Sequence, residues 1–122
     1  MDQSVQQPDQ ATLDLEALKA RCMGNLALVE RVLAKFTGQL DNDLDAFERA
    51  IETDNAEQAA QLAHRIKGTA GSVAAGHLYL NASLAEQRAQ DRQVAELSSD
   101  LARMRNDRLE LAETIERLKR GA

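Results

Sequence analysis

The segment AHRIKGTAGSVAAG, residues 63–76, concentrates the side chains of this protein that could do chemistry. His64 carries an imidazole; when the ring is neutral, one nitrogen can attack an electrophile while the other holds a proton. Lys67, Gly68 and Gly71 follow at three, four and seven positions. On a helix these spacings place all three residues on the face of His64. The pattern predicts a histidine with a positive charge beside it and little side-chain bulk around it.

The apolar residues of this segment fall on the side opposite His64 when each residue turns a helix by about 100°. They are Ala59, Leu62, Ala63, Ile66, Ala70 and Val73. Each glycine inside a helix costs about 0.5–1 kcal/mol relative to alanine, so Gly68 and Gly71 need an explanation. Either they let another helix approach closely, or they leave an open area where a second protein can bring a reactive group to His64.

Helical periodicity covers most of the chain and predicts an all-α fold. The expected helices are 12–21 with Thr12 as N-cap, 26–53, one that follows the Asp54–Asn55 turn and ends near 74–76, 77–90, and one that begins near 91. Two of them have about 26 residues, or about 40 Å. We therefore expect an antiparallel four-helix bundle with a short additional N-terminal helix over residues 12–120. Residues 1–11, rich in Gln and Asp, predict a flexible tail.

The last expected helix has the most regular apolar pattern. Its apolar residues are Val94, Leu97, Leu101, Met104, Leu111, Ile115 and Leu118. They form a heptad seam interrupted only by Arg108, which predicts a core-facing helix. A coiled coil that dimerises the protein is the alternative.

Composition excludes several classes of function. The net charge of −5 and an aromatic content of 2% disfavour a nucleic-acid partner, which requires basic and stacking surfaces. No apolar run is long enough to span a membrane, and the start of the chain lacks a secretion signal. The single cysteine, Cys22, forms no internal disulfide, so we expect a cytoplasmic protein. No glycine-rich phosphate loop or metal-binding carboxylate cluster is recognisable, a metal site joining His64 and His77 is disfavoured, and we expect no cofactor.

Residues 64–71 resemble the His-x-x-Lys-Gly-Ser/Thr-Ala-Gly signature of histidine-containing phosphotransfer domains, the shuttle modules of two-component phosphorelays. The similarity continues at positions where that family has small or apolar residues, here Ala75, Leu78 and Ala82. Glu86 occupies the place of a Glu or Gln from the next helix. Two positions differ: Ala74 replaces the usual turn glycine, and Ala85 replaces a common leucine.

The resemblance implies that Nε2 of His64 accepts a phosphoryl group and that Glu86 orients the imidazole through Nδ1. Lys67 is then expected to stabilise the phosphoryl charge, and Gly68 and Gly71 to leave the docking surface open. The donor is an aspartyl phosphate on a receiver domain, which also holds the Mg²⁺, and the chain has no ATP-dependent kinase activity of its own.

The implied partners are response-regulator receiver domains, a hybrid sensor histidine kinase, or both, and we expect a monomer. A helical docking or dimerisation module that carries no phosphate is the alternative. The phosphoacceptor domain of a larger kinase is a third possibility.

Overall fold

The computed structural model describes residues 12–121, and within them it contains α-helices and one short 3-10 helix but no strand. The elements are α2 (Leu15–Arg21), α3 (Leu26–Glu52), α4 (Ala56–Ser72), α5 (Gly76–Gln90), η1 (Val94–Glu96) and α6 (Leu97–Gly121). The all-α prediction is confirmed. The tail expected over residues 1–11 lies outside the described residues. No helix in the described part of the chain is long and apolar enough to cross a membrane.

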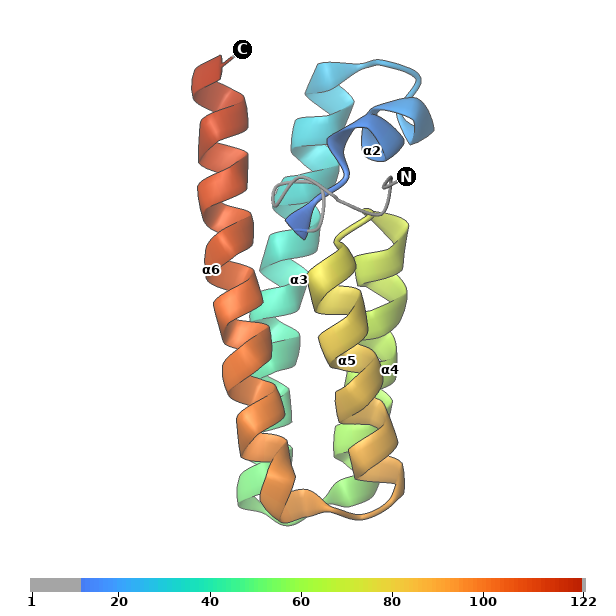
Figure 1. Ribbon diagram of the computed structural model, residues 1–122, viewed down its shortest axis with the longest axis vertical. Helices are drawn as coiled ribbons and strands as arrows, with labels where there is room; N and C mark the ends of the chain where they lie inside the picture. The colour runs from blue at the N-terminus through green and yellow to red at the C-terminus, as the bar shows by residue number, and fades with distance from the viewer. Residues whose placement is uncertain (1–11, 122) are drawn as a thin grey trace, which may run out of the picture.

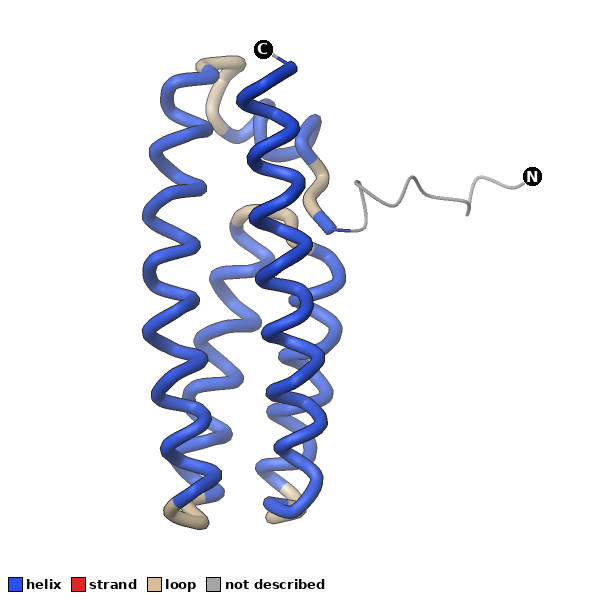
Figure 2. The backbone as a smooth tube through the Cα atoms, turned by 90° about the vertical axis from the view of Figure 1, so that its left-hand side faces the viewer, coloured by secondary structure: helices blue, strands red, loops and turns tan. Residues whose placement is uncertain are grey.

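The four long helices form an antiparallel bundle in which each packs beside its neighbours in the chain (Figure 1). α3 lies between α4 and α6, and α5 lies opposite α3 between the same two helices. α3 and α6 extend beyond the shorter pair α4 and α5, and α2 lies over that end of the pair (Figures 1 and 2). The bundle with an additional N-terminal helix is therefore the architecture that the periodicity predicts.

Side-chain caps explain where two of the bundle helices begin. Asn25 accepts a hydrogen bond from the backbone N–H of Leu28, and Asn55 accepts one from that of Gln58. Each cap satisfies a backbone donor that the first turn leaves without a partner. These starts, and the end of α3 at Glu52, agree closely with the predicted ones.

Three predicted boundaries are wrong. The N-cap of α2 is Asp14 rather than Thr12, and its carboxylate accepts the N–H of Ala17. α4 ends at Ser72, two residues short of the predicted end. α6 does not begin near residue 91, because a turn and η1 precede it and the helix starts at Leu97. Apolar spacing does not distinguish a 3-10 turn from the first turn of an α-helix.

The core is made almost entirely of the apolar faces that the periodicity predicts. On α6 the fully buried apolar residues are Leu97, Met104 and Leu111, seven positions apart. However, Asp100 and Asp107, three positions after Leu97 and Met104, are also buried on this face of α6. The seam is therefore not purely aliphatic. The sequence pattern identified Arg108 as the one interruption of the seam. In the structure Arg108 extends toward α3, and its Nε lies 2.7 Å from an Asp41 carboxylate oxygen.

α2 is tied to the C-terminal end of α4. The Arg21 guanidinium donates to the backbone carbonyls of Gly71 at 2.9 Å and Ser72 at 2.6 Å. The backbone N–H of Asp14 donates to the carbonyl of Ala74 at 2.9 Å. These bonds satisfy carbonyls that the end of a helix leaves open. They hold the segment that follows His64 in place without covering it.

Candidate functional site

His64 lies on the outer face of α4, and its side chain is 71% exposed. Ala63 and Ile66, its neighbours on the other side of the helix, are completely buried. The helical wheel predicted this orientation, because the apolar stripe of α4 must face the core. The imidazole is therefore accessible to a second protein.

Glu86, from α5, lies directly beside the imidazole. Its Oε2 is 2.9 Å from Nδ1 of His64. Because an ionised carboxylate can only accept, Nδ1 of the neutral ring carries the proton in this contact and Nε2 keeps its lone pair. Within the described residues Nε2 has no hydrogen-bond partner. The pair therefore presents a nucleophilic nitrogen to solvent.

Lys67 lies on the same face, and the structure places its ammonium between α4 and α5. Nζ is 3.4 Å from Oε1 of Glu86 and 6.0 Å from the ring centroid of Tyr79. The two oxygens of Glu86 thus contact the imidazole and the ammonium separately. The side chain of Lys67 remains 34% exposed. It can reach an anionic group attached to the ring by a change of rotamer.

Sequence reasoning did not identify Gln90 or Tyr79 as parts of this site. The amide nitrogen of Gln90 is 3.5 Å from Oε2 of Glu86. Its spacing of four residues from Glu86 on one helix is the signal that could have found it. Tyr79 carries no such local signal, because its contact with Lys67 depends on how α4 and α5 pack.

Gly68 and Gly71 are exposed on the face of His64. A Cβ atom added at either position would meet no heavy atom within 4 Å. Close approach of another helix of this chain therefore does not explain either glycine. Exposed apolar side chains are also present on α5, the helix that supplies Glu86; they are Tyr79, Leu80 and Leu84.

An ion pair between α4 and α3 fixes the orientation of α4 about its own axis. Arg65, adjacent to His64, binds the buried carboxylate of Asp43 on α3 through Nη2 at 2.7 Å and Nε at 3.3 Å. The hydrogen bond from Arg65 to Asp43 and the charge of that carboxylate raise the pKa of the guanidinium. Gln39 donates a further hydrogen bond to Asp43 at 3.0 Å. A two-point contact of this kind fixes direction as well as distance, so it keeps His64 facing outward.

A second charged cluster holds α5, the helix of Glu86. Arg88 binds the buried Asp100 of α6, and Arg103 donates to the same carboxylate oxygen at 2.7 Å. Glu96 lies 3.5 Å from Nε of Arg88. The other oxygen of Asp100 is buried without a hydrogen-bond partner among the described residues. Both helices of the site are thus tied to the opposite pair of the bundle by arginine–aspartate contacts.

Two residues considered in the sequence lie elsewhere. His77 is near the start of α5, and its Nδ1 is 3.5 Å from a Glu110 carboxylate oxygen on α6. Cys22 is buried at the end of α2 and has no disulfide partner. Neither residue contributes to the group formed by His64, Glu86 and Lys67.

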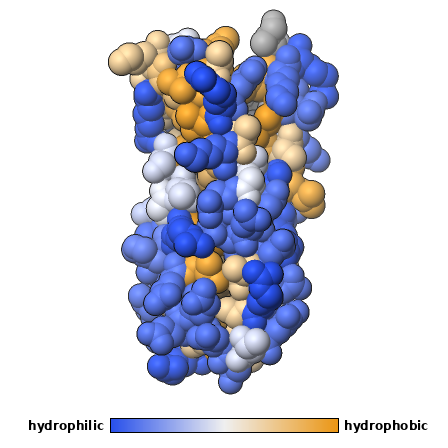
Figure 3. Space-filling view, turned by 180° about the vertical axis from the view of Figure 1, so that it is seen from behind, coloured by the Kyte–Doolittle hydropathy of each residue, from blue (hydrophilic) through white to orange (hydrophobic). Residues whose placement is uncertain are grey.

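The face of the molecule seen from behind is mainly hydrophilic, and its apolar surface is divided into separate areas (Figure 3). His64 does not line the three cavities found beside α6, and its side chain is largely exposed. The site is therefore suited to a reaction in which a second macromolecule supplies the electrophile.

Comparison with known proteins agrees with this geometry. A family model described as "Hpt domain" matches residues 31–121, about three quarters of the chain, and the match includes all the site residues above. No curated protein and no solved structure gives a significant match. The chain therefore belongs to the Hpt domain family, whose members act in histidine phosphotransfer in phosphorelays.

Proposed function

We propose that this protein carries a phosphoryl group on Nε2 of His64, accepts it from an aspartyl phosphate of a receiver domain and passes it to another receiver. The observation that carries the proposal is the His64–Glu86 contact of 2.9 Å on an exposed face. It leaves Nε2 as the one ring nitrogen available for attack. We expect the relay to operate in the cytoplasm.

The transfer exchanges one bond to phosphorus for another. The lone pair of Nε2 forms the N–P bond while the bond between phosphorus and the aspartyl oxygen breaks, and the electron pair of that bond leaves with the aspartate carboxylate. Positive charge develops on the imidazole as the N–P bond forms. The carboxylate of Glu86 stabilises this charge through the Nδ1 proton, as a carboxylate does for a catalytic histidine in other enzymes.

Lys67 provides the positive charge for the transferred group. Phosphoryl transfer depends mainly on positioning and on neutralising the charge of the equatorial oxygens. In the unphosphorylated protein the ammonium rests near Glu86, 3.4 Å from Oε1. When a phosphoryl group is attached to the neighbouring ring, a dianion competes for the same ammonium. Mg²⁺ for the reaction comes from the receiver domain in this proposal.

The docking surface in this proposal is the outer face of α4 around His64. Gly68 and Gly71 project no side chain from it, so the receiver backbone can approach until the aspartyl phosphate reaches Nε2. Reacting atoms must come within about 3–3.5 Å for an efficient transfer. Exposed Tyr79, which lies on the same side of α5 as Glu86, offers apolar area for the same partner.

Incubation with a ³²P-phosphorylated receiver domain tests the function. We expect label on this chain that is acid-labile and base-stable, and no label on the His64→Gln variant. His77→Gln is the matched control, because it removes the other histidine of the chain and should be labelled at the wild-type rate. If wild type stays unlabelled with every receiver of its own source, the phosphocarrier proposal is wrong and a docking role without phosphate remains.

The role of Glu86 is tested by rates of transfer. Glu86→Ala should lower the rate by about 10- to 100-fold, the usual effect of removing a group that orients a histidine. Glu86→Gln should lower it less, because its amide oxygen still accepts a hydrogen bond from the Nδ1–H group. Equal rates for wild type and Glu86→Ala would show that the 2.9 Å contact does not contribute to the reaction.

A further inference from the structure

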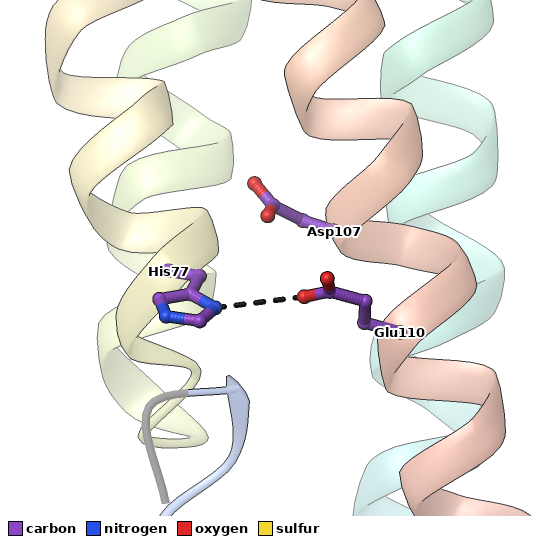
Figure 4. A group of neighbouring side chains, drawn as sticks. All are labelled: His77, Asp107 and Glu110. Carbon is purple, nitrogen blue, oxygen red and sulfur yellow. Dashed lines mark ion pairs between the residues drawn. The ribbon is translucent and has the colours of Figure 1, made fainter. Parts of the chain in front are cut away.

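We propose that His77, Asp107 and Glu110 form a binding site for one divalent transition-metal ion of the Zn²⁺ class, separate from the His64 site. One potential ligand atom from each residue lies within 4.8 Å of the other two. His77 extends from α5, and both carboxylates extend from α6 into the space between the helices (Figure 4). This proposal does not depend on the phosphocarrier function.

Two of the three ligand atoms already have the separation expected of ligands to one ion. Asp107 and Glu110 are three positions apart on α6, so they share one face of the helix. Ligand atoms 2.0–2.1 Å from a tetrahedral Zn²⁺ are about 3.4 Å apart. Nδ1 of His77 and Oε1 of Glu110 are already 3.5 Å apart. Both side chains are partly exposed, so small rotamer changes can bring them toward Asp107.

Charge supplies an independent reason for a cation here. Three aspartates of the described chain are buried: Asp43, Asp100 and Asp107. The first is paired with Arg65 and the second with Arg88 and Arg103. Asp107, 5% exposed, has no Lys or Arg within ion-pair distance among the described residues. A buried carboxylate that has no Lys or Arg in contact is costly, and a bound metal ion would offset that cost.

The surroundings of Asp107 fit the role of a ligand. Its Oδ2 accepts a hydrogen bond from the Asn81 amide at 2.7 Å, whereas no hydrogen bond to Oδ1 occurs within the described residues. Asn81 lies one turn after His77 on α5 and orients the carboxylate, as second-shell groups do in metal sites.

The donor set indicates which ion. One imidazole nitrogen and two carboxylate oxygens, with a position open to water, suit Zn²⁺ and Co²⁺. Mg²⁺ and Ca²⁺ prefer shells made of oxygen ligands, so the imidazole nitrogen of His77 disfavours them. His77 and Glu86 are nine residues apart on α5, or about 180° around the helix. The ion would therefore join α5 to α6 on the side away from His64.

The test is metal titration of the full chain after treatment with EDTA. We expect one equivalent of Co²⁺ to give a visible absorption spectrum, and Zn²⁺ to displace it. His77→Ala and Glu110→Gln should each weaken binding by more than about tenfold, and Asp107→Asn should do the same. Zn²⁺ should also raise the thermal midpoint of the wild type but not of His77→Ala, because the ion binds only the folded site.

Two matched controls separate this site from others. Glu113→Gln changes the same type of side chain on α6, three positions further along, and should bind as the wild type does. His64→Gln removes the other histidine and should also bind normally. Absence of binding by the wild type at millimolar Co²⁺ or Zn²⁺ overturns the proposal. So does binding that survives His77→Ala or disappears in His64→Gln, since the ion then sits elsewhere.

Discussion

Replacement of Gly68 and Gly71 by alanine should make this protein more stable and less active. A Cβ atom at either position would meet no heavy atom within 4 Å apart from the adjacent backbone of its own helix. Neither glycine has the left-handed backbone that only glycine adopts easily. Each substitution should therefore gain the full helix-propensity difference, about 0.5–1 kcal/mol, or roughly 1–2 kcal/mol for the double variant. For a domain of this size the thermal midpoint should rise by about 4 °C per kcal/mol.

The rate of phosphoryl transfer to His64 should decrease in the same variants. Two methyl groups on the face of His64 would hold a receiver domain away from Nε2, and a misplacement of about 1 Å can cost about 100-fold in rate. The assays are urea unfolding of the free protein and the initial rate of label transfer from a phosphorylated receiver. Stability and rate are measured on the same preparations.

Gly38→Ala is the matched control. Gly38 is exposed inside α3, and a Cβ there also meets nothing within 4 Å. It should show the same gain in unfolding free energy with an unchanged rate. A loss of stability in Gly68→Ala or Gly71→Ala would refute the structural reading. A gain in stability with wild-type transfer would refute the docking role of the glycines while leaving the structure intact.

Three further predictions concern stability. Ala74→Gly should raise the unfolding free energy by roughly 0.5–1 kcal/mol, because Ala74 has a left-handed φ of 62°; unchanged urea midpoints would contradict this strain. Asp100→Asn should lower the free energy of unfolding by about 1–3 kcal/mol, because Arg88 and Arg103 lose their carboxylate partner. An equal loss when Asp100→Asn is made in an Arg88→Met, Arg103→Met double variant would contradict this reasoning. Asp107 has a raised pKa in the folded state, so its stabilising effect is complete at low pH and is lost as pH rises through the folded value. In metal-free buffer Asp107→Asn should therefore gain stability relative to wild type as pH rises from about 3.5 to 7, and a difference independent of pH would contradict this reasoning.

Helix positions and the exposed face of α4 could be predicted from the sequence because they depend on local geometry. A helix turns by a constant angle per residue, so the spacing of His64, Lys67, Gly68 and Gly71 places them together wherever the helix lies. The apolar stripe then determines which side faces solvent. Boundaries were less accurate: Asp14 rather than Thr12 caps α2, and η1 delays the start of α6. These details depend on single hydrogen bonds rather than on periodicity.

Contacts between helices were decided by the tertiary structure. Only the resemblance pointed to Glu86 as a partner of His64, and nothing in the spacing predicted that its other oxygen would lie near Lys67. The buried aspartates of α6 were missed for the same reason. An aspartate in a heptad seam reads as a surface residue until packing brings an arginine or a histidine from another helix beside it.

The sequence by itself thus determined the helical class and the presentation of His64, since both follow from the fixed turn of a helix and the burial of apolar side chains. Only the tertiary structure decided what surrounds the polar groups, such as His77 of α5 beside Asp107 and Glu110 of α6. The physical reason is that contacts between residues about 20 to 70 positions apart depend on the relative rotation and height of packed helices. Those quantities are determined by the whole core and not by any one segment.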